Sequence, residues 1–184
     1  MAIDEGVETA ILAGGCFWCL EAVFEQVEGV TKVVSGYTGG HIANPSYQQV
    51  CSETTGHAEA VQITFCQESI TFEEILEIFF DIHDPTTLNR QGNDIGASYR
   101  SAIFCQDLNQ RSIAESTVSD LHLRRVYRDP IVTEIVDFKQ FYRAEDYHQE
   151  YYRNNSTQPY CQVVISPKLN KFREKYVKRI KADA

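Results

Sequence analysis

Runs of residues typical of strands alternate with runs typical of helices along the whole chain. The strand-like runs are rich in β-branched and aromatic residues and occupy residues 8–13, 31–36, 58–65, 99–104, 131–136 and 161–166. The helix-like runs have apolar residues at helical spacing and occupy residues 16–26, 71–83, 108–124, 140–154 and 167–181. Because each helix needs a sheet face to cover, we predict an α+β fold, a two-layer α/β sandwich with a mixed sheet.

The length and composition indicate a single domain over residues 1–184. A chain of 184 residues that is 43% hydrophobic can bury a core without metal or disulfide support. We expect the core to span about residues 8–166 and a C-terminal helical tail to span about residues 167–184. Thr71, followed by Glu74 three residues later, predicts a capping box at the start of the helix over 71–83.

The charge and the cysteine content exclude several classes of protein. The formal net charge of −9 opposes binding to nucleic acid or to anionic membrane surfaces. No apolar run approaches the ~20 residues that span a bilayer, and the N-terminus lacks the pattern of a signal peptide. We therefore expect a cytoplasmic monomer with no nucleic-acid or membrane partner. In such a chain, six cysteines suggest free thiols, some of them with a redox or metal role.

Cys16 follows a double glycine that joins a strand-like run to a helix-like run. Gly14 and Gly15 allow a tight turn, and Cys16 then falls at the start of the helix. The unpaired N–H groups and the dipole at a helix start favour a thiolate over a thiol. We therefore predict that Cys16 is a nucleophile whose pKa lies below the ordinary thiol value of about 8.5. The alternative is a small buried hydrophobic residue.

The residues after Cys16 leave several interpretations open. Phe17 and Trp18 are either core residues or the lining of an apolar cup that holds a small hydrophobic group beside the sulfur. Cys19 forms a CxxC pair with Cys16, which suits a redox pair, half of a zinc site or a structural thiol. Structural zinc usually needs two spaced ligand pairs, and the sequence has no second CxxC, so we predict no metal site.

Seven segments together closely resemble the methionine sulfoxide reductase A family, in order and spacing, from about residue 14 to residue 151. They are GGCFWCLE, GYTGG, NPSY, GHAEAV, HDPT, RQGNDIGASYRSAI and AEDYHQEY. The resemblance implies a single catalytic domain with a ferredoxin-like core. It also implies reduction of methionine-S-sulfoxide, free or in proteins, with no bound cofactor and with an external thioredoxin-type dithiol as reductant.

The resemblance also implies roles for individual residues. A sulfoxide oxygen must be protonated as its bond to sulfur weakens, and a carboxylic acid with a pKa raised by burial can supply that proton. Tyrosine hydroxyls can bind the oxygen without adding charge. The implied set is Cys16 as nucleophile, Glu59 as proton donor, Tyr47 and Tyr99 as ligands of the oxygen, Asp94 as organiser of the site, and Phe17 and Trp18 as the pocket for the substrate's methyl group.

The attack leaves a sulfenic acid on Cys16, which a second thiol must convert to a disulfide. Cys161 matches the first tail cysteine of the family, but it is followed by a strand-like and then a helix-like run, with no further cysteine. The resolving thiol is therefore Cys161 or Cys19, and we favour Cys161. We expect structural roles for Cys51, Cys66 and Cys105, with a position near the site as the alternative for Cys51, which closely follows Tyr47. We expect His57 and His148 to be structural or to support the reacting groups from outside.

Two other classes of protein fit the CxxC pair. One is a metal or thiol sensor, which tightly bound zinc would indicate. The other is a dithiol oxidoreductase of thioredoxin type, although Phe17 and Trp18 are bulky residues to lie between its cysteines.

Overall fold

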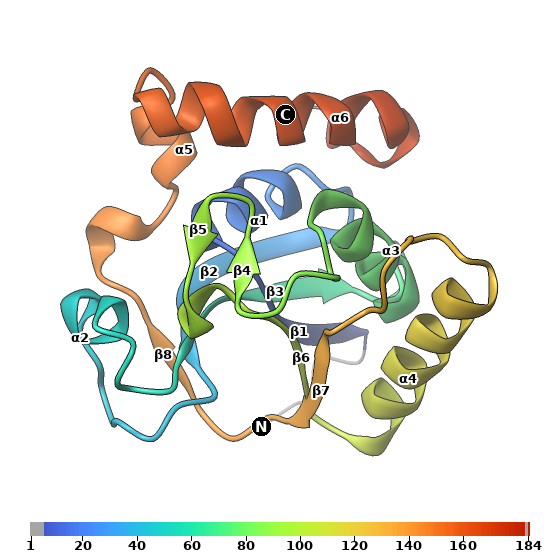
Figure 1. Ribbon diagram of the computed structural model, residues 1–184. Helices are drawn as coiled ribbons and strands as arrows, with labels where there is room; N and C mark the ends of the chain where they lie inside the picture. Colours follow the sequence, from blue (N-terminus) through green and yellow to red (C-terminus); the bar gives the residue numbers. More distant parts are fainter. Residues whose placement is uncertain (1–5, 183) are drawn as a thin grey trace.

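The computed structural model describes residues 6–182 and 184, which form an α+β fold around a mixed, strongly curled six-stranded sheet (Figure 1). The strand order is β7-β6-β1-β3-β2-β8, and only the β6–β7 pair is parallel. The strands are β1 (Val7–Gly14), β2 (Val30–Thr38), β3 (Ala58–Cys66), β6 (Ser101–Cys105), β7 (Glu134–Asp137) and β8 (Phe141–Arg143). A separate hairpin pairs β4 (Arg90–Gln91) with β5 (Asp94–Ile95).

The helices follow most of the predicted helix-like runs. They are α1 (Phe17–Phe24), α2 (Tyr47–Cys51), α3 (Phe72–Ile82), α4 (Leu108–Leu123), α5 (Tyr151–Asn155) and α6 (Ser166–Lys175). The predicted capping box is confirmed, because the Thr71 side chain accepts a hydrogen bond from the Glu74 N–H and the Glu74 side chain accepts one from the Thr71 N–H. No helix in the described part of the chain is long and apolar enough to cross a membrane.

Alternate side chains of β1 face two different apolar clusters. Ala10 and Leu12 belong to the main core, which α1, α3 and α6 cover. Ile11 and Ala13 belong to a smaller cluster with Phe104 on the other face of the sheet. In Figure 1, α6 crosses above α1 and α3. The main core therefore lies between the sheet and these three helices, and alternate β1 side chains point to the two faces of the sheet.

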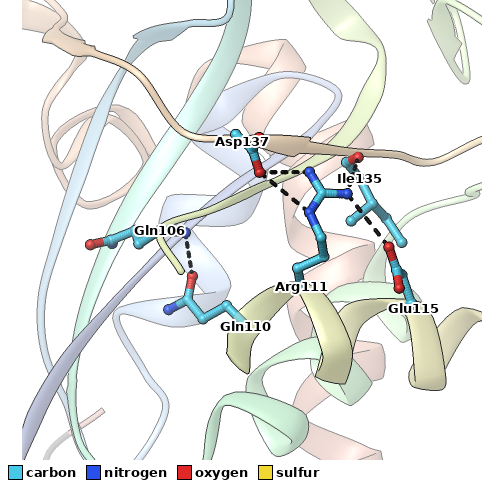
Figure 2. A network of polar contacts seen from close by, with 6 residues as sticks. All are labelled: Gln106, Gln110, Arg111, Glu115, Ile135 and Asp137. Carbon is cyan, nitrogen blue, oxygen red and sulfur yellow. Dashed lines mark hydrogen bonds and ion pairs between the residues drawn. The ribbon is translucent and has the colours of Figure 1, made fainter. Parts of the chain in front are cut away.

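Polar contacts hold α4 against the edge of the sheet (Figure 2). The guanidinium of Arg111 donates to Asp137 at 2.7 Å and to the carbonyl of Ile135 at 3.3 Å, so the helix is tied to β7. Gln110 accepts a hydrogen bond from the backbone N–H of Gln106 at 3.1 Å and closes the turn before the helix. These contacts lie at the far end of β6 from its first residue, Ser101, which pairs with Gly14.

The strand predicted over residues 161–166 is wrong. Cys161–Ile165 forms a π-helical turn that runs directly into α6. Cys161, Ile165 and Leu169 recur every four residues and are all fully buried, whereas Val163 is 74% exposed. Burial of this stripe against the core therefore overrides the strand propensity of the β-branched residues.

The single helix predicted over residues 140–154 is also wrong. The segment forms β8, a 3₁₀ turn at Asp146–His148 and then α5. Glu150 has a left-handed φ of 51°, which no helix interior permits, and the backbone of Ala144 donates to Ser35 on β2 at 2.9 Å. Pairing with the sheet edge therefore replaces the helix in the first half of this segment.

The strand predicted over residues 99–104 begins later than expected. Tyr99 lies in a 3₁₀ turn ahead of β6 rather than in the strand.

Candidate active site

Cys16 lies at the turn from β1 to α1. Gly15 has a φ of +94°, and a Cβ atom there would lie 2.6 Å from Cγ of Gln91. Only glycine fits this left-handed, crowded position without strain. The turn makes Cys16 the N-cap residue of α1. The double glycine therefore places the thiol at a helix start, as the sequence predicts.

The predicted low pKa of Cys16 is not what the structure shows. Burial, first of all, raises the pKa of the Cys16 thiol well above its usual value, and the neighbouring Cys19 and Glu59 raise it further. The residue is only 8% exposed. Loss of hydration disfavours the thiolate more than the helix start favours it. In the resting protein Cys16 is therefore a neutral thiol.

Glu59 points from β3 toward the start of α1. Its side chain is 2% exposed, and its Oε2 accepts a hydrogen bond from the backbone N–H of Phe17 at 3.0 Å. Burial raises the pKa of Glu59 to about 8, and the charge of Asp94 adds to this effect, while the Phe17 N–H opposes it. The Cys16 thiol also interacts with this carboxyl group. Glu59 is therefore a neutral acid at pH 7, next to the thiol.

Two tyrosines and Asp94 surround Glu59. Tyr47 is the first residue of α2, and Tyr99 ends the 3₁₀ turn before β6. Burial raises the pKa of both phenols, and the charge of Glu59 contributes, so both remain protonated donors. Asp94, on β5, accepts a hydrogen bond from the hydroxyl of Tyr160 at 2.8 Å. The structure therefore brings Tyr47, Tyr99 and Asp94 to the same place as Glu59.

Phe17 and Trp18 differ in their surroundings. Phe17 is fully buried in the main core, with its ring 5.8 Å from that of Tyr37. Trp18 is half-buried, and its ring stacks on that of Tyr151 with centroids 3.6 Å apart and planes 6° apart. The ring of Tyr160 meets Trp18 edge-on at 5.8 Å. Trp18 is therefore packed between two tyrosines from the C-terminal part of the chain.

His148, which the sequence predicts to be structural or to support the site, belongs to this aromatic group. Its ring lies 5.0 Å from that of Phe17 and 4.5 Å from that of Tyr47. Nδ1 accepts a hydrogen bond from Nε1 of Trp18 at 3.1 Å. Burial lowers the pKa of His148. Because Nδ1 accepts the indole N–H of Trp18, the neutral ring carries its proton on Nε2. Within the described residues, that buried Nε2 has no hydrogen-bond partner.

Two thiols besides Cys16 lie in this region. Cys19 is one helical turn after Cys16, and its N–H donates to the Cys16 carbonyl at 3.1 Å. The interaction with the Cys16 thiol lowers the pKa of Cys19 to about 7 against the opposing effect of burial, and the charge of Lys168 helps. Cys161 is fully buried. Burial raises the pKa of the Cys161 thiol, and the charge of Cys19 raises it further. Cys19 therefore interacts with both Cys16 and Cys161.

The remaining sequence candidates have other surroundings. Cys51 is exposed beside Tyr47, whereas Cys66 and Cys105 are the last residues of β3 and β6, at the ends of these strands away from Cys16. His57 accepts from the Gly40 N–H at 3.0 Å and bonds the Ile42 carbonyl at 2.7 Å, so it fixes the loop after β2. Within the described residues, no group of three or more His, Cys, Asp or Glu side chains is arranged to hold a metal ion.

The fold and this constellation define a thiol-dependent redox enzyme. A sequence model of the family "Peptide methionine sulfoxide reductase" matches residues 8–181. The enzyme MsrA of Saccharolobus solfataricus is 53% identical over 95% of this chain and 98% of its own. The chain therefore belongs to the peptide methionine sulfoxide reductase A family, and it reduces methionine sulfoxide to methionine.

Solved structures agree with this assignment. Reduced Mxr1 from Saccharomyces cerevisiae matches with a TM-score of 0.78 and 30% identity over 88% of this chain and 92% of that chain. Mxr1 in complex with Trx2 matches with a TM-score of 0.56 and 23% identity over 82% of this chain and 88% of that chain. This second match shows that the two chains share the fold.

Proposed function

We propose that Cys16 reduces methionine-S-sulfoxide, free or in proteins, with Glu59 as the acid. The observation that carries this proposal is the buried, neutral carboxyl group of Glu59 beside the Cys16 thiol. The thiol sulfur attacks the sulfoxide sulfur while Glu59 gives its proton to the oxygen and regains one from the thiol. The oxygen passes to Cys16, which becomes a sulfenic acid, and the substrate leaves as the thioether.

The surrounding side chains suit the binding of a methyl sulfoxide. The hydroxyls of Tyr47 and Tyr99 stay protonated and donate to the oxygen, and Asp94 keeps the pKa of Glu59 high. Phe17 and Trp18 receive the methyl group. The unpartnered Nε2–H of His148 supports a hydrogen bond to an acceptor of the substrate, because a buried donor costs free energy until it is paired.

Entry of the substrate requires Tyr160 to move. Its ring packs on Trp18 and its hydroxyl binds Asp94, so Cys16 keeps little exposure in this state. The Asp94 hydrogen bond and the edge-on contact with Trp18 contribute about 1–3 kcal/mol to holding the ring there, and the Tyr160 hydroxyl also interacts with the Cys19 thiol. These contacts must break before a substrate reaches Cys16.

We further propose that Cys19, rather than Cys161, resolves the sulfenic acid. The Cys19 thiol interacts directly with Cys16, and its pKa of about 7 provides thiolate at neutral pH. That thiolate attacks the Cys16 sulfur and expels hydroxide, which forms a Cys16–Cys19 disulfide. Cys161 then attacks Cys19, which releases the Cys16 thiol and forms a Cys19–Cys161 disulfide. A thioredoxin-type dithiol reduces that disulfide, a partner class that the Mxr1 complex with Trx2 supports.

A single-turnover experiment tests the catalytic assignment. The reduced protein is mixed with an equimolar methionine-S-sulfoxide peptide without external reductant, and product and thiols are quantified by mass spectrometry. One methionine should form for every two thiols lost, and the Cys16→Ser variant should form none. Normal product formation by that variant would contradict the role of Cys16.

The architecture supports three further expectations. The elements β1, α1, β2, β3, α3 and β6, with sheet order β6-β1-β3-β2, fit a ferredoxin-like core. A single catalytic domain over residues 1–184 is supported by α6, whose Leu169 and Phe172 belong to the main core. The free thiols suit a cytoplasmic address, and light scattering would test the expected monomer.

A further inference from the structure

A buried carboxylate on α1 takes no part in the chemistry above. Glu21 is 1% exposed. Its Oε1 accepts the backbone N–H of Glu150 at 2.9 Å, and its Oε2 accepts that of Tyr151 at 3.3 Å. A buried carboxylate is costly unless it is paired, and here its partners are two successive main-chain donors 129 and 130 residues away.

The backbone that Glu21 holds carries part of the aromatic wall around Trp18. Glu150 is the left-handed residue at which the chain turns into α5. Tyr151, the next residue, stacks on Trp18, and His148 binds the indole N–H of Trp18. Glu21 and Trp18 lie three residues apart on α1. The same helix therefore binds the backbone of Glu150 and Tyr151 through Glu21 and contacts the Tyr151 side chain through Trp18.

A second contact fixes the same segment from the other side. Oε1 of Gln149 accepts the Ser35 N–H at 3.0 Å, and Nε2 of Gln149 donates to the Ser35 carbonyl at 2.9 Å. Gln149 thus extends the edge of β2, while Glu21 ties the following two residues to the helix. Of these two anchors, only Glu21 connects the segment to the helix that carries Trp18.

We propose that Glu21 is a positioning residue for substrate binding. By accepting the N–H groups of Glu150 and Tyr151, it sets Tyr151 against Trp18 and so fixes the wall that receives the methyl group of the sulfoxide. This role rests on the proposed binding of the substrate at Phe17 and Trp18. Glu21 acts through Tyr151 and His148 and does not touch the reacting atoms.

The Glu21→Gln variant tests the proposal. Its amide keeps the shape and one acceptor, but its NH₂ group faces one of the two N–H donors, so the segment loosens. We expect KM for a methionine-S-sulfoxide peptide to rise about tenfold, while the single-turnover rate at saturating substrate changes less than about threefold. Because Trp18 is the only tryptophan, its fluorescence emission should shift as the stack with Tyr151 loosens.

Glu28→Gln is the control. It makes the same substitution at an exposed side chain four residues after the end of α1. We expect wild-type KM and wild-type emission from this variant. A folded Glu21→Gln protein with both quantities unchanged, or with a lower single-turnover rate and an unchanged KM, would overturn the proposal.

Two more variants keep the test decisive. Tyr151→Leu leaves the buried carboxylate in place and should itself raise KM and shift the emission. An unchanged KM in that variant overturns the proposal even if Glu21→Gln fails to fold. Trp18→Leu tests the binding site alone. If it leaves KM unchanged, the assignment of the site fails; if it raises KM while Glu21→Gln does not, the positioning role fails.

Discussion

The carboxyl group of Glu59 accepts the backbone N–H of Phe17 at 3.0 Å, which ties the acid to the first turn of the helix that begins at Cys16. The acid on β3 and the thiol on α1 are thereby held in one arrangement, although they are 43 residues apart in the sequence, as their numbers 16 and 59 show. Burial keeps both groups protonated, so the proposed nucleophile and the proposed proton donor start the reaction without charge.

Replacement of Glu59 by glutamine should slow the reduction step about 100-fold at pH 7, because the amide cannot deliver a proton. Substrate binding should change little, since the glutamine Oε1 still accepts the Phe17 N–H. Single-turnover kinetics with a methionine-S-sulfoxide peptide measure both quantities. The exposed Glu73→Gln variant is the control, and a wild-type rate for Glu59→Gln would remove Glu59 as the acid.

The reduction step should also depend on pH through Glu59. Because its pKa is raised to about 8, the acid form is present below pH 8 and is lost as the pH rises through that value. The wild-type single-turnover rate should therefore fall with a midpoint near pH 8. Glu59→Gln should not show this titration; if it keeps the same midpoint, another group is responsible.

Removal of the Cys16 thiol should raise the pKa of Cys19. The interaction with Cys16 is the largest effect that lowers the pKa of Cys19 to about 7. Without that interaction, the burial of Cys19 should raise its pKa. The ultraviolet absorbance of thiolates, followed against pH, should show a transition near pH 7 in the wild type that moves upward in Cys16→Ala. Cys66→Ala controls for loss of a thiol elsewhere, and an unmoved transition in Cys16→Ala would contradict the coupling.

Serine variants should distinguish the two resolving thiols. Cys19→Ser should reduce one sulfoxide and then stop with a sulfenic acid on Cys16, because burial raises the pKa of the other candidate thiol, Cys161, and disfavours its thiolate. Cys161→Ser should form the Cys16–Cys19 disulfide but turn over slowly with thioredoxin as reductant. Trapping the sulfenic acid with a dimedone reagent, followed by mass spectrometry, separates these states. Formation of a Cys16–Cys161 disulfide in wild-type protein after one turnover would favour the opposite order.

Truncation of Tyr160 should expose the active site. Tyr160→Ala removes the ring that packs on Trp18 and the hydroxyl that binds Asp94, so Cys16 should react several-fold faster with a small neutral alkylating reagent. Peptide mapping measures the rate at Cys16. Tyr176→Ala, which removes a tyrosine bonded to Asp81, should leave that rate unchanged. An equal rate in Tyr160→Ala and wild type would show that Tyr160 does not limit access.

Local sequence signals were sufficient where neighbouring residues decide the structure. The capping residues Thr71 and Glu74 mark the start of α3, and the double glycine before Cys16 marks the turn into α1. The strands around Ala10 and Ile63 follow from their β-branched and apolar runs. The family assignment made from seven short segments is confirmed by the comparisons.

Tertiary contacts decided the rest, because desolvation and long-range pairing have no local signature. The pKa of Cys16 rises since the fold buries it, against the effect of its helix start. Cys161 lies on a helical turn because burial against the core outweighs the strand propensity of its neighbours. His148 joins the site, and Glu21 reaches Tyr151, only because the sheet edge at Ser35 draws their segment across α1. Electrostatic and packing energies of this kind depend on which distant residues exclude water, and the folded chain alone fixes that.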